Sequence, residues 1–68
     1  MNVVLNGEPH ELPDEATVRA AIAASGAHGE GRGVAVALDG EVVPRGRWDA
    51  TPLRDGQRVE VVQAVQGG

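Results

Sequence analysis

A chain of 68 residues forms at most one small domain, which has room for one thin hydrophobic layer but hardly for an enclosed active site of its own. It contains no cysteine, which excludes disulfide bonds and thiolate metal sites. Six arginines and no lysine stand against ten carboxylates, for a formal net charge of -4 at pH 7; this balance disfavours nucleic-acid binding and favours a partner with a basic surface.

The first residues predict a β-hairpin. The run VVL at 3–5 ends at Asn6-Gly7, and Asn-Gly supplies the two positive-φ residues of a type I′ turn. Residues 2–6 and 8–12 are therefore expected to pair as antiparallel strands.

Residues 17–25 predict a short helix. Val18, Ala21 and Ile22 recur at spacings of three and four residues, which places them on one buried stripe, and Gly26 is a natural C-cap. The glycine-rich residues that follow are interpreted as a plain loop, because a phosphate-binding loop needs a strand before it and a helix after it.

The second half of the chain predicts three more strands. Residues 34–38 (VAVAL) alternate and end at a second hairpin turn, Asp39-Gly40, from which residues 41–43 return. An irregular connector over 44–57 then leads to the last strand, 58–64.

The order strand, strand, helix, strand, strand, strand favours an α+β fold of the β-grasp (ubiquitin-like) type. We expect a mixed sheet of four to five strands with the helix packed across one face, and the last strand beside the first in the middle of the sheet. The β-grasp domain is expected to span residues 1–65, and residues 66–68 to form a flexible C-terminal Gly-Gly tail.

Side chains with catalytic potential are few. His10 lies on a predicted strand and His28 in the glycine-rich loop, and neither has a histidine or carboxylate partner at a spacing typical of a metal site. We therefore expect no catalytic residue in this chain, and no metal or cofactor bound by it.

Trp48 is the only aromatic residue. Its polar neighbours favour a half-buried anchor for the connector, and a contact point for a partner is the alternative. The nearby Arg45, Arg47, Arg54 and Arg58 are explained equally well by a solvated face and by a surface for an acidic patch on a partner.

The C-terminus is the remaining candidate for chemistry. Gly67 and Gly68 have no Cβ, so they can thread a narrow channel, and they follow a strand expected at the centre of the sheet. The Gly68 carboxylate is ionised at pH 7 and is a poor electrophile, so it must be activated, usually as a mixed anhydride with a nucleotide. Because the chain holds no ATP-site motif, this activation must come from a separate enzyme.

Over essentially its whole length the sequence resembles the sulfur carrier proteins of thiamine biosynthesis, which are ubiquitin-like donors of sulfur to the thiazole ring. The matching features are N-G-E at 6–8, T-V at 17–18, V-A-V-A-L-D-G-E-V-V-P-R at 34–45, Trp48, D-G at 55–56, V-E-V-V at 59–62 and the terminal G-G. The stretch from 34 to 48 and the tail are the specific parts of this match.

The resemblance implies a carrier that partner enzymes modify, not an enzyme. An adenylating enzyme related to ubiquitin-activating enzymes would use ATP and magnesium to activate Gly68, with Gln66 and Gly67 threading its active site. A persulfide relay, fed by a cysteine desulfurase or another persulfide donor, would convert the adenylate to a thiocarboxylate, and thiazole synthase would take the sulfur. With no cysteine, the chain cannot itself carry the persulfide.

Strand parity predicts a surface for these partners. If the odd-numbered residues of the first and last strands face the helix, Val4 and Val62 face away on adjacent strands. With Ala64 leading to the tail they would form an exposed docking patch, unless a loop covers them. Gln63 and Val65 fit this parity poorly, so a bulge or the end of the strand is expected near Ala64.

Other functions stay open at this point. The small subunit of molybdopterin synthase is also a β-grasp sulfur carrier that ends in Gly-Gly, although it is usually longer and richer in aromatic residues. A plain β-grasp binding module would need no free C-terminus, and an autonomous enzyme is the least favoured hypothesis.

No apolar run approaches the about 20 residues that cross a bilayer, and the N-terminus has no signal-peptide pattern. We therefore expect a cytoplasmic protein without a membrane partner.

Overall fold

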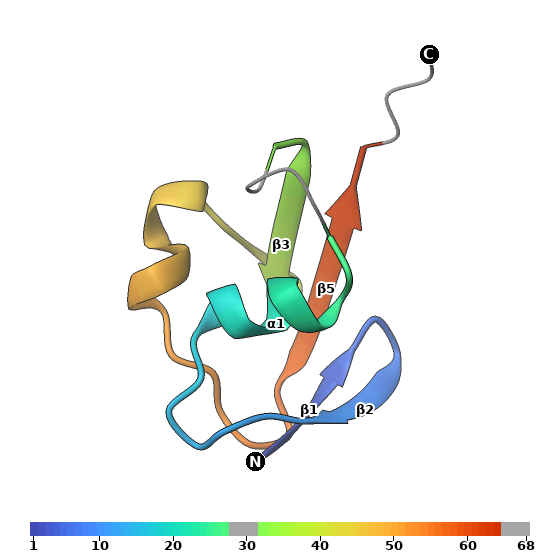
Figure 1. Ribbon diagram of the computed structural model, residues 1–68, viewed down its shortest axis with the longest axis vertical. Coiled ribbons are helices and arrows are strands. Elements are labelled where there is room, and N and C mark those ends of the chain that lie inside the picture. The colour runs from blue at the N-terminus through green and yellow to red at the C-terminus, as the bar shows by residue number, and fades with distance from the viewer. Residues whose placement is uncertain (28–31, 65–68) are drawn as a thin grey trace.

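The computed structural model describes residues 1–27 and 32–64, so the tail expected at 66–68 lies outside the described residues. The elements, shown in Figure 1, are strands β1 (Asn2–Leu5) and β2 (Glu8–Glu11), helix α1 (Val18–Ala24), strands β3 (Val34–Leu38) and β4 (Glu41–Val43), the 3₁₀ helix η2 (Arg45–Ala50) and strand β5 (Arg58–Gln63). No helix among the described residues is long and apolar enough to cross a membrane.

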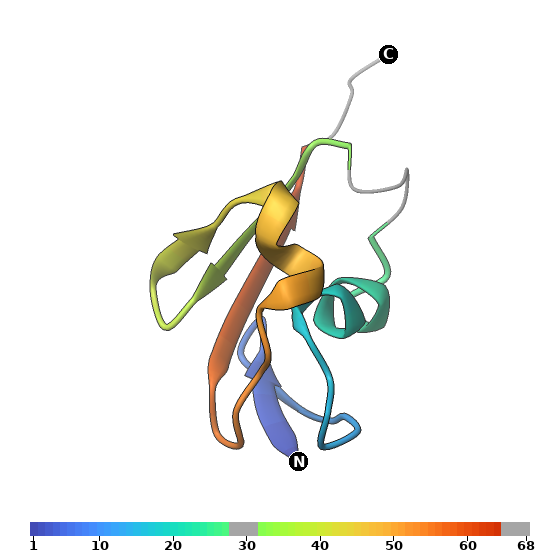
Figure 2. The same cartoon turned by 90° about the vertical axis from the view of Figure 1, so that its left-hand side faces the viewer.

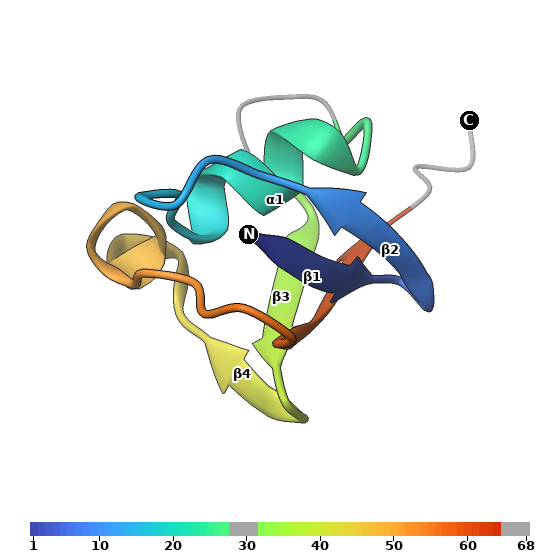
Figure 3. The same ribbon diagram turned by 90° about the horizontal axis from the view of Figure 1, so that it is seen from below.

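The described strands form one five-stranded mixed sheet in the order β2-β1-β5-β3-β4. β5 pairs parallel with β1 and antiparallel with β3, so the last strand lies in the centre of the sheet, as predicted. α1 and η2 lie on the same side of this sheet (Figures 2 and 3). A mixed sheet with one α-helix across one face is the predicted α+β, β-grasp fold.

In both hairpins the two central residues of the turn have a left-handed backbone conformation, as the dipeptides Asn-Gly and Asp-Gly predict. Asn6 and Gly7 have φ values of 50° and 84°, and Asp39 and Gly40 have φ values of 48° and 87°. Positive φ at both central positions is characteristic of the type I′ turn, whose twist matches that of the flanking strands. These turns therefore set the register of β1 on β2 and of β3 on β4.

The hydrophobic core lies between the sheet and the two helices. α1 contributes Val18, Ala21 and Ile22, which are all buried, as their spacing predicts. The odd-numbered residues of β1 and β5 are buried on the same side of the sheet, namely Val3, Leu5, Val59 and Val61. The parity assigned to these two strands from the sequence is therefore confirmed.

The connector at 44–57 is more ordered than the sequence predicted. It contains η2, and Trp48 on this helix is only 1% exposed: the residue does anchor the connector, as predicted, but it is fully buried instead of half-buried, and it is no surface contact for a partner. The reason is that the seven residues of α1 cover only part of the sheet, and the indole of Trp48 packs into the core beside them. Its N–H donates to the carbonyl of Val43 at 3.0 Å, so the buried ring keeps no unpaired polar atom.

Arg19 ties α1 to η2 at the surface. Its guanidinium lies 5.2 Å from the centroid of the Trp48 ring, within the range of a cation–π contact, and its Nε donates to Oδ1 of Asp49 at 2.9 Å. This hydrogen bond, together with the attraction between the two charges, lowers the pKa of the Asp49 carboxyl below its usual range.

Replacing Trp48 with alanine should cost about 3–5 kcal/mol of unfolding free energy, because the largest fully buried side chain is removed. Urea denaturation followed by far-UV circular dichroism measures this loss. Val42→Ala, at a residue that is 71% exposed, is the control and should change the unfolding free energy by less than about 0.5 kcal/mol. Equal losses in the two variants would contradict the placement of Trp48 in the core.

Asp49→Asn should lower the melting temperature slightly near neutral pH and not in strong acid. Because folding lowers the pKa of Asp49, its ion pair stabilises the fold above the usual aspartate pKa of about 3.9, and this contribution is lost as the pH falls through the lower folded value. The effect is small because both side chains are exposed to water. Melting curves of the two proteins between neutral pH and about pH 2 should converge at the acid end; a constant difference would exclude a charge effect.

Candidate functional site

One face of the sheet carries none of the described helices, since α1 and η2 both lie on the opposite side (Figures 2 and 3). Two large hydrophobic side chains are exposed in the sheet: Val62 on β5, at 64%, and Val42 on β4, at 71%. β3 lies between them, with Ala35 paired to Val62 and Ala37 paired to Val42. We call Ala35, Ala37, Val42 and Val62 the open-face patch; together with Glu60 they line a hollow of about 180 Å³.

Val62 and Ala64 lie where the sequence placed them. Val62 is not covered by any loop of the described chain, and Ala64 is exposed directly after β5. β5 ends at Gln63, which agrees with the strand end predicted near Ala64. The backbone N–H of Ala64 still donates to the carbonyl of Gly33 at 2.8 Å, so the chain is tied to the sheet up to this residue.

Val4 does not lie next to Val62. In the parallel register Val4 pairs with Arg58, which precedes Val62 by four residues, or about 13 Å along the strand. The apolar surface near the end of β5 therefore extends towards β3 and β4 instead of towards β1. The sequence did contain a signal for this extension, since the alternation in residues 34–38 places Ala35 and Ala37 on the face opposite to the core.

The predicted reactive residues, Gly68 with Gln66 and Gly67, lie outside the described residues, and their roles stay predictions. The structure describes the strand that leads to them. Four residues beyond Ala64 bring the chain to Gly68, and four extended residues span at most about 14 Å. Chain length therefore limits the Cα of Gly68 to within about 14 Å of the Cα of Ala64.

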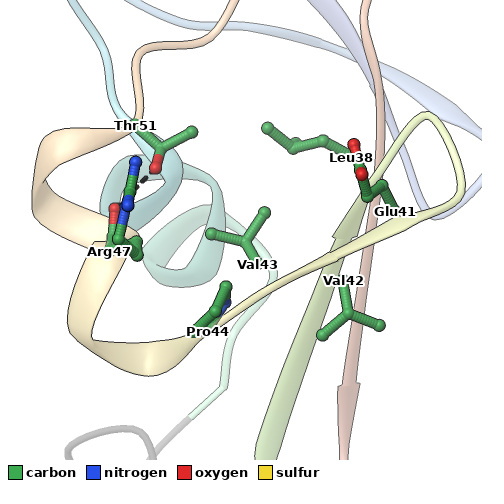
Figure 4. A pocket seen from close by; sticks show the side chains of 7 residues that line it. All are labelled: Leu38, Glu41, Val42, Val43, Pro44, Arg47 and Thr51. Carbon is green, nitrogen blue, oxygen red and sulfur yellow. Dashed lines mark hydrogen bonds between the residues drawn. The ribbon is translucent and has the colours of Figure 1, made fainter.

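A cavity of about 280 Å³ lies between β4 and η2 (Figure 4). Leu38 and Val43 give it apolar walls, and Glu41 and Arg47 are its charged residues. The hydroxyl of Thr51, which also lines it, donates to the backbone carbonyl of Arg47 at 2.6 Å. This lining contains no nucleophilic side chain paired with a general base, so the cavity lacks the residues that an active site needs.

Among the described residues, histidine takes part in no metal site. His10 lies on β2, and His28 lies outside the described residues. Within residues 1–27 and 32–64, no group of three or more histidine and carboxylate side chains is placed to hold a metal ion.

The four arginines of the last third lie in different segments of the fold. Arg45 and Arg47 belong to η2, whereas Arg54 and Arg58 each line a hollow that also contains Asp39. Carboxylates thus lie beside Arg54 and Arg58 near the Asp39-Gly40 turn.

Comparisons with known proteins agree with each other. The sequence model of the ThiS family matches residues 3–68. The crystal structure of the thiamine biosynthesis protein (ThiS) from Geobacter metallireducens is similar with a TM-score of 0.78 and 33% sequence identity, over 100% of both chains. The solution NMR structure of a thiamine biosynthesis protein from Geobacter metallireducens is similar with a TM-score of 0.80 and 33% identity, over 100% of this chain and 88% of that one. No curated protein sequence gives a significant match.

Proposed function

This chain belongs to the ThiS family, and we propose that it works as a sulfur carrier in thiamine biosynthesis. The observation that carries the proposal is the family match over residues 3–68, which includes the terminal Gly-Gly. The full-length similarity to a thiamine biosynthesis protein favours this pathway over that of the molybdenum cofactor.

The sulfur is held at Gly68 in this proposal. A carboxylate oxygen of Gly68 attacks the α-phosphorus of ATP, the bond to pyrophosphate breaks, and a mixed anhydride with AMP forms. The outer sulfur of a persulfide then attacks the carbonyl carbon, and AMP leaves. A thiol cleaves the S–S bond of the resulting acyl disulfide and retains the other sulfur in a new disulfide, which leaves a thiocarboxylate on Gly68.

The chain needs partners for each of these steps. ATP and magnesium are bound by an adenylating enzyme, the persulfide comes from a cysteine desulfurase or another donor, and thiazole synthase receives the sulfur. The chain has no cysteine of its own, so its terminal carboxyl is its route to holding sulfur. Because the activation consumes ATP, the proposal places the cycle in the cytoplasm.

The adenylating enzyme is the proposed occupant of the open-face patch. Val62 lies two residues before Ala64, and Gly68 lies within about 14 Å of Ala64. A partner that holds the tail in its active site can therefore cover the patch at the same time. Burying Val62 and Val42, both largely exposed in the free chain, provides the apolar contact for such docking.

The central test is the intact mass of the protein after incubation with the adenylating enzyme, ATP, magnesium and a persulfide donor. We expect one carboxyl oxygen to be replaced by sulfur. Adding one residue after Gly68 should abolish this exchange, because the carboxylate is then displaced from the reacting phosphorus; a plain β-grasp binding module would tolerate the addition. An unchanged mass of the wild-type protein after incubation with its authentic partners would refute the proposal.

A second test concerns docking. Val62→Asp should reduce kcat/KM for adenylation about tenfold or more, mainly through KM, because a charge replaces an apolar contact. The residue is 64% exposed, so the fold is expected to persist. Ala23→Asp places the same charge on an exposed residue of α1, on the other side of the sheet, and should leave KM unchanged. Equal effects of the two substitutions would exclude a specific contact at Val62.

A further inference from the structure

The last residues of β5 have a neighbouring strand on one side only. β3 pairs with β5 as far as Gln63, whereas β1 ends at Leu5, which pairs with Val59. β5 therefore extends beyond β1 from Glu60 onwards. On the β1 side, the peptide groups of this overhang would have no partner strand, and unpaired backbone groups that are shielded from water are costly.

Asn6, the first residue of the β1–β2 turn, closes this gap. Its backbone N–H donates to the carbonyl of Val59 at 2.8 Å. Its side-chain Oδ1 accepts the N–H of Val61 at 2.8 Å, and its Nδ2 donates to the carbonyl of Val61 at 3.2 Å. The side-chain amide thus takes the place of the peptide group that one more residue of β1 would have supplied.

The turn alone does not require asparagine. The Asp39-Gly40 turn has the same left-handed geometry with aspartate in first position, and Oδ1 of Asp39 accepts the N–H of Arg58 at 3.2 Å. An acceptor is sufficient there, but Val61 presents a donor and an acceptor together. Of the residues that favour this turn position, namely asparagine, aspartate and glycine, only asparagine carries both a donor and an acceptor.

We propose that Asn6 is a positioning residue for the Gly68 carboxylate. By holding Val61 from the β1 side, while Gly33 holds Ala64 from the β3 side, it keeps the overhang of β5 extended and fixes the direction in which the tail leaves the sheet. The proposal rests on the proposed function, because it assumes that the terminal carboxylate must reach a reacting phosphorus in a partner. Loss of the anchor leaves the tail attached but less often aligned, which lowers kcat for adenylation.

Two substitutions separate the side chain from the turn. Asn6→Gly keeps a residue that favours positive φ and removes the amide, and Asn6→Asp keeps the acceptor but turns a charged oxygen towards the carbonyl of Val61. Asp39→Gly is the matched control, since it removes a turn side chain that binds the start of β5. All proteins are compared at a temperature at which circular dichroism shows them folded.

Amide hydrogen exchange of the isolated chain tests the anchor without any partner. In Asn6→Gly the Val61 amide should exchange about tenfold faster than in the wild type, the loss expected when a hydrogen bond of ordinary strength is removed. The Val4 amide, which donates to the carbonyl of Gln57 at 2.9 Å, is the internal reference and should be unchanged. An unchanged Val61 rate would overturn the proposal.

The rate of pyrophosphate release with the adenylating enzyme, ATP and magnesium tests the positioning role. We expect kcat to fall about three- to tenfold for Asn6→Gly, with KM little changed, as an anchor of one or two hydrogen bonds permits. The kcat of Asn6→Asp should fall at least as far, and Asp39→Gly should retain the wild-type kcat. Wild-type kcat in Asn6→Gly despite faster Val61 exchange, or an equal fall in Asp39→Gly, would overturn the role of Asn6. Failure of the wild type to release pyrophosphate would instead refute the proposed function, and the positioning role with it.

Discussion

The parallel pairing of the first and last strands is the constraint on which the rest of the structure depends. It places β5 between β1 and β3, where Val59 and Val61 are buried. Parallel strands cannot be joined by a tight turn, so the chain between them must cross over, and this crossover contains α1, the β3–β4 hairpin and η2. The C-terminal strand, which in many domains frays at the edge, is thereby fixed at the centre of the sheet.

The two faces of the sheet differ in what the described elements place on them. Covering one face already takes α1 and η2 together, with Trp48 filling the core beside the short α-helix. None of the described helices covers the other face, which in an antiparallel sheet open to water would usually carry polar side chains. Val42 and Val62 are exposed there instead. Val62, one position before the end of β5, belongs to the apolar patch that the proposed partner would cover.

Local features of the sequence predicted most of the fold, and features that depend on distant residues were missed. The two turn dipeptides and the stripe of Val18, Ala21 and Ile22 are encoded within a few residues. Parity correctly gave the buried face of β1 and β5. It does not fix the offset of a parallel pair, so Val4 and Val62 were expected in one patch although they lie four residues apart in register. η2 was missed because a single 3₁₀ segment has no repeat long enough to show a period. The bond between Asn6 and Val61 joins residues 55 positions apart, beyond the reach of any local pattern.

The overhang of β5 reconciles two demands on the end of a carrier chain. A tail that enters a partner's active site needs free space around the point where it leaves the domain, and a longer β1 would place the β1–β2 hairpin beside that point. A strand end that is paired on one side only, however, is held less firmly than one between two strands. Asn6 meets both demands, because a single side chain satisfies the peptide group of Val61 without adding another strand. On the β3 side the bond from Ala64 to Gly33 does the same, and Gly33, at a φ of 67°, holds a left-handed conformation in which most side chains would be strained. Beyond the pairing of β5 with β3, order at this end of the sheet thus comes from two turn residues, which take up less room than a second flanking strand.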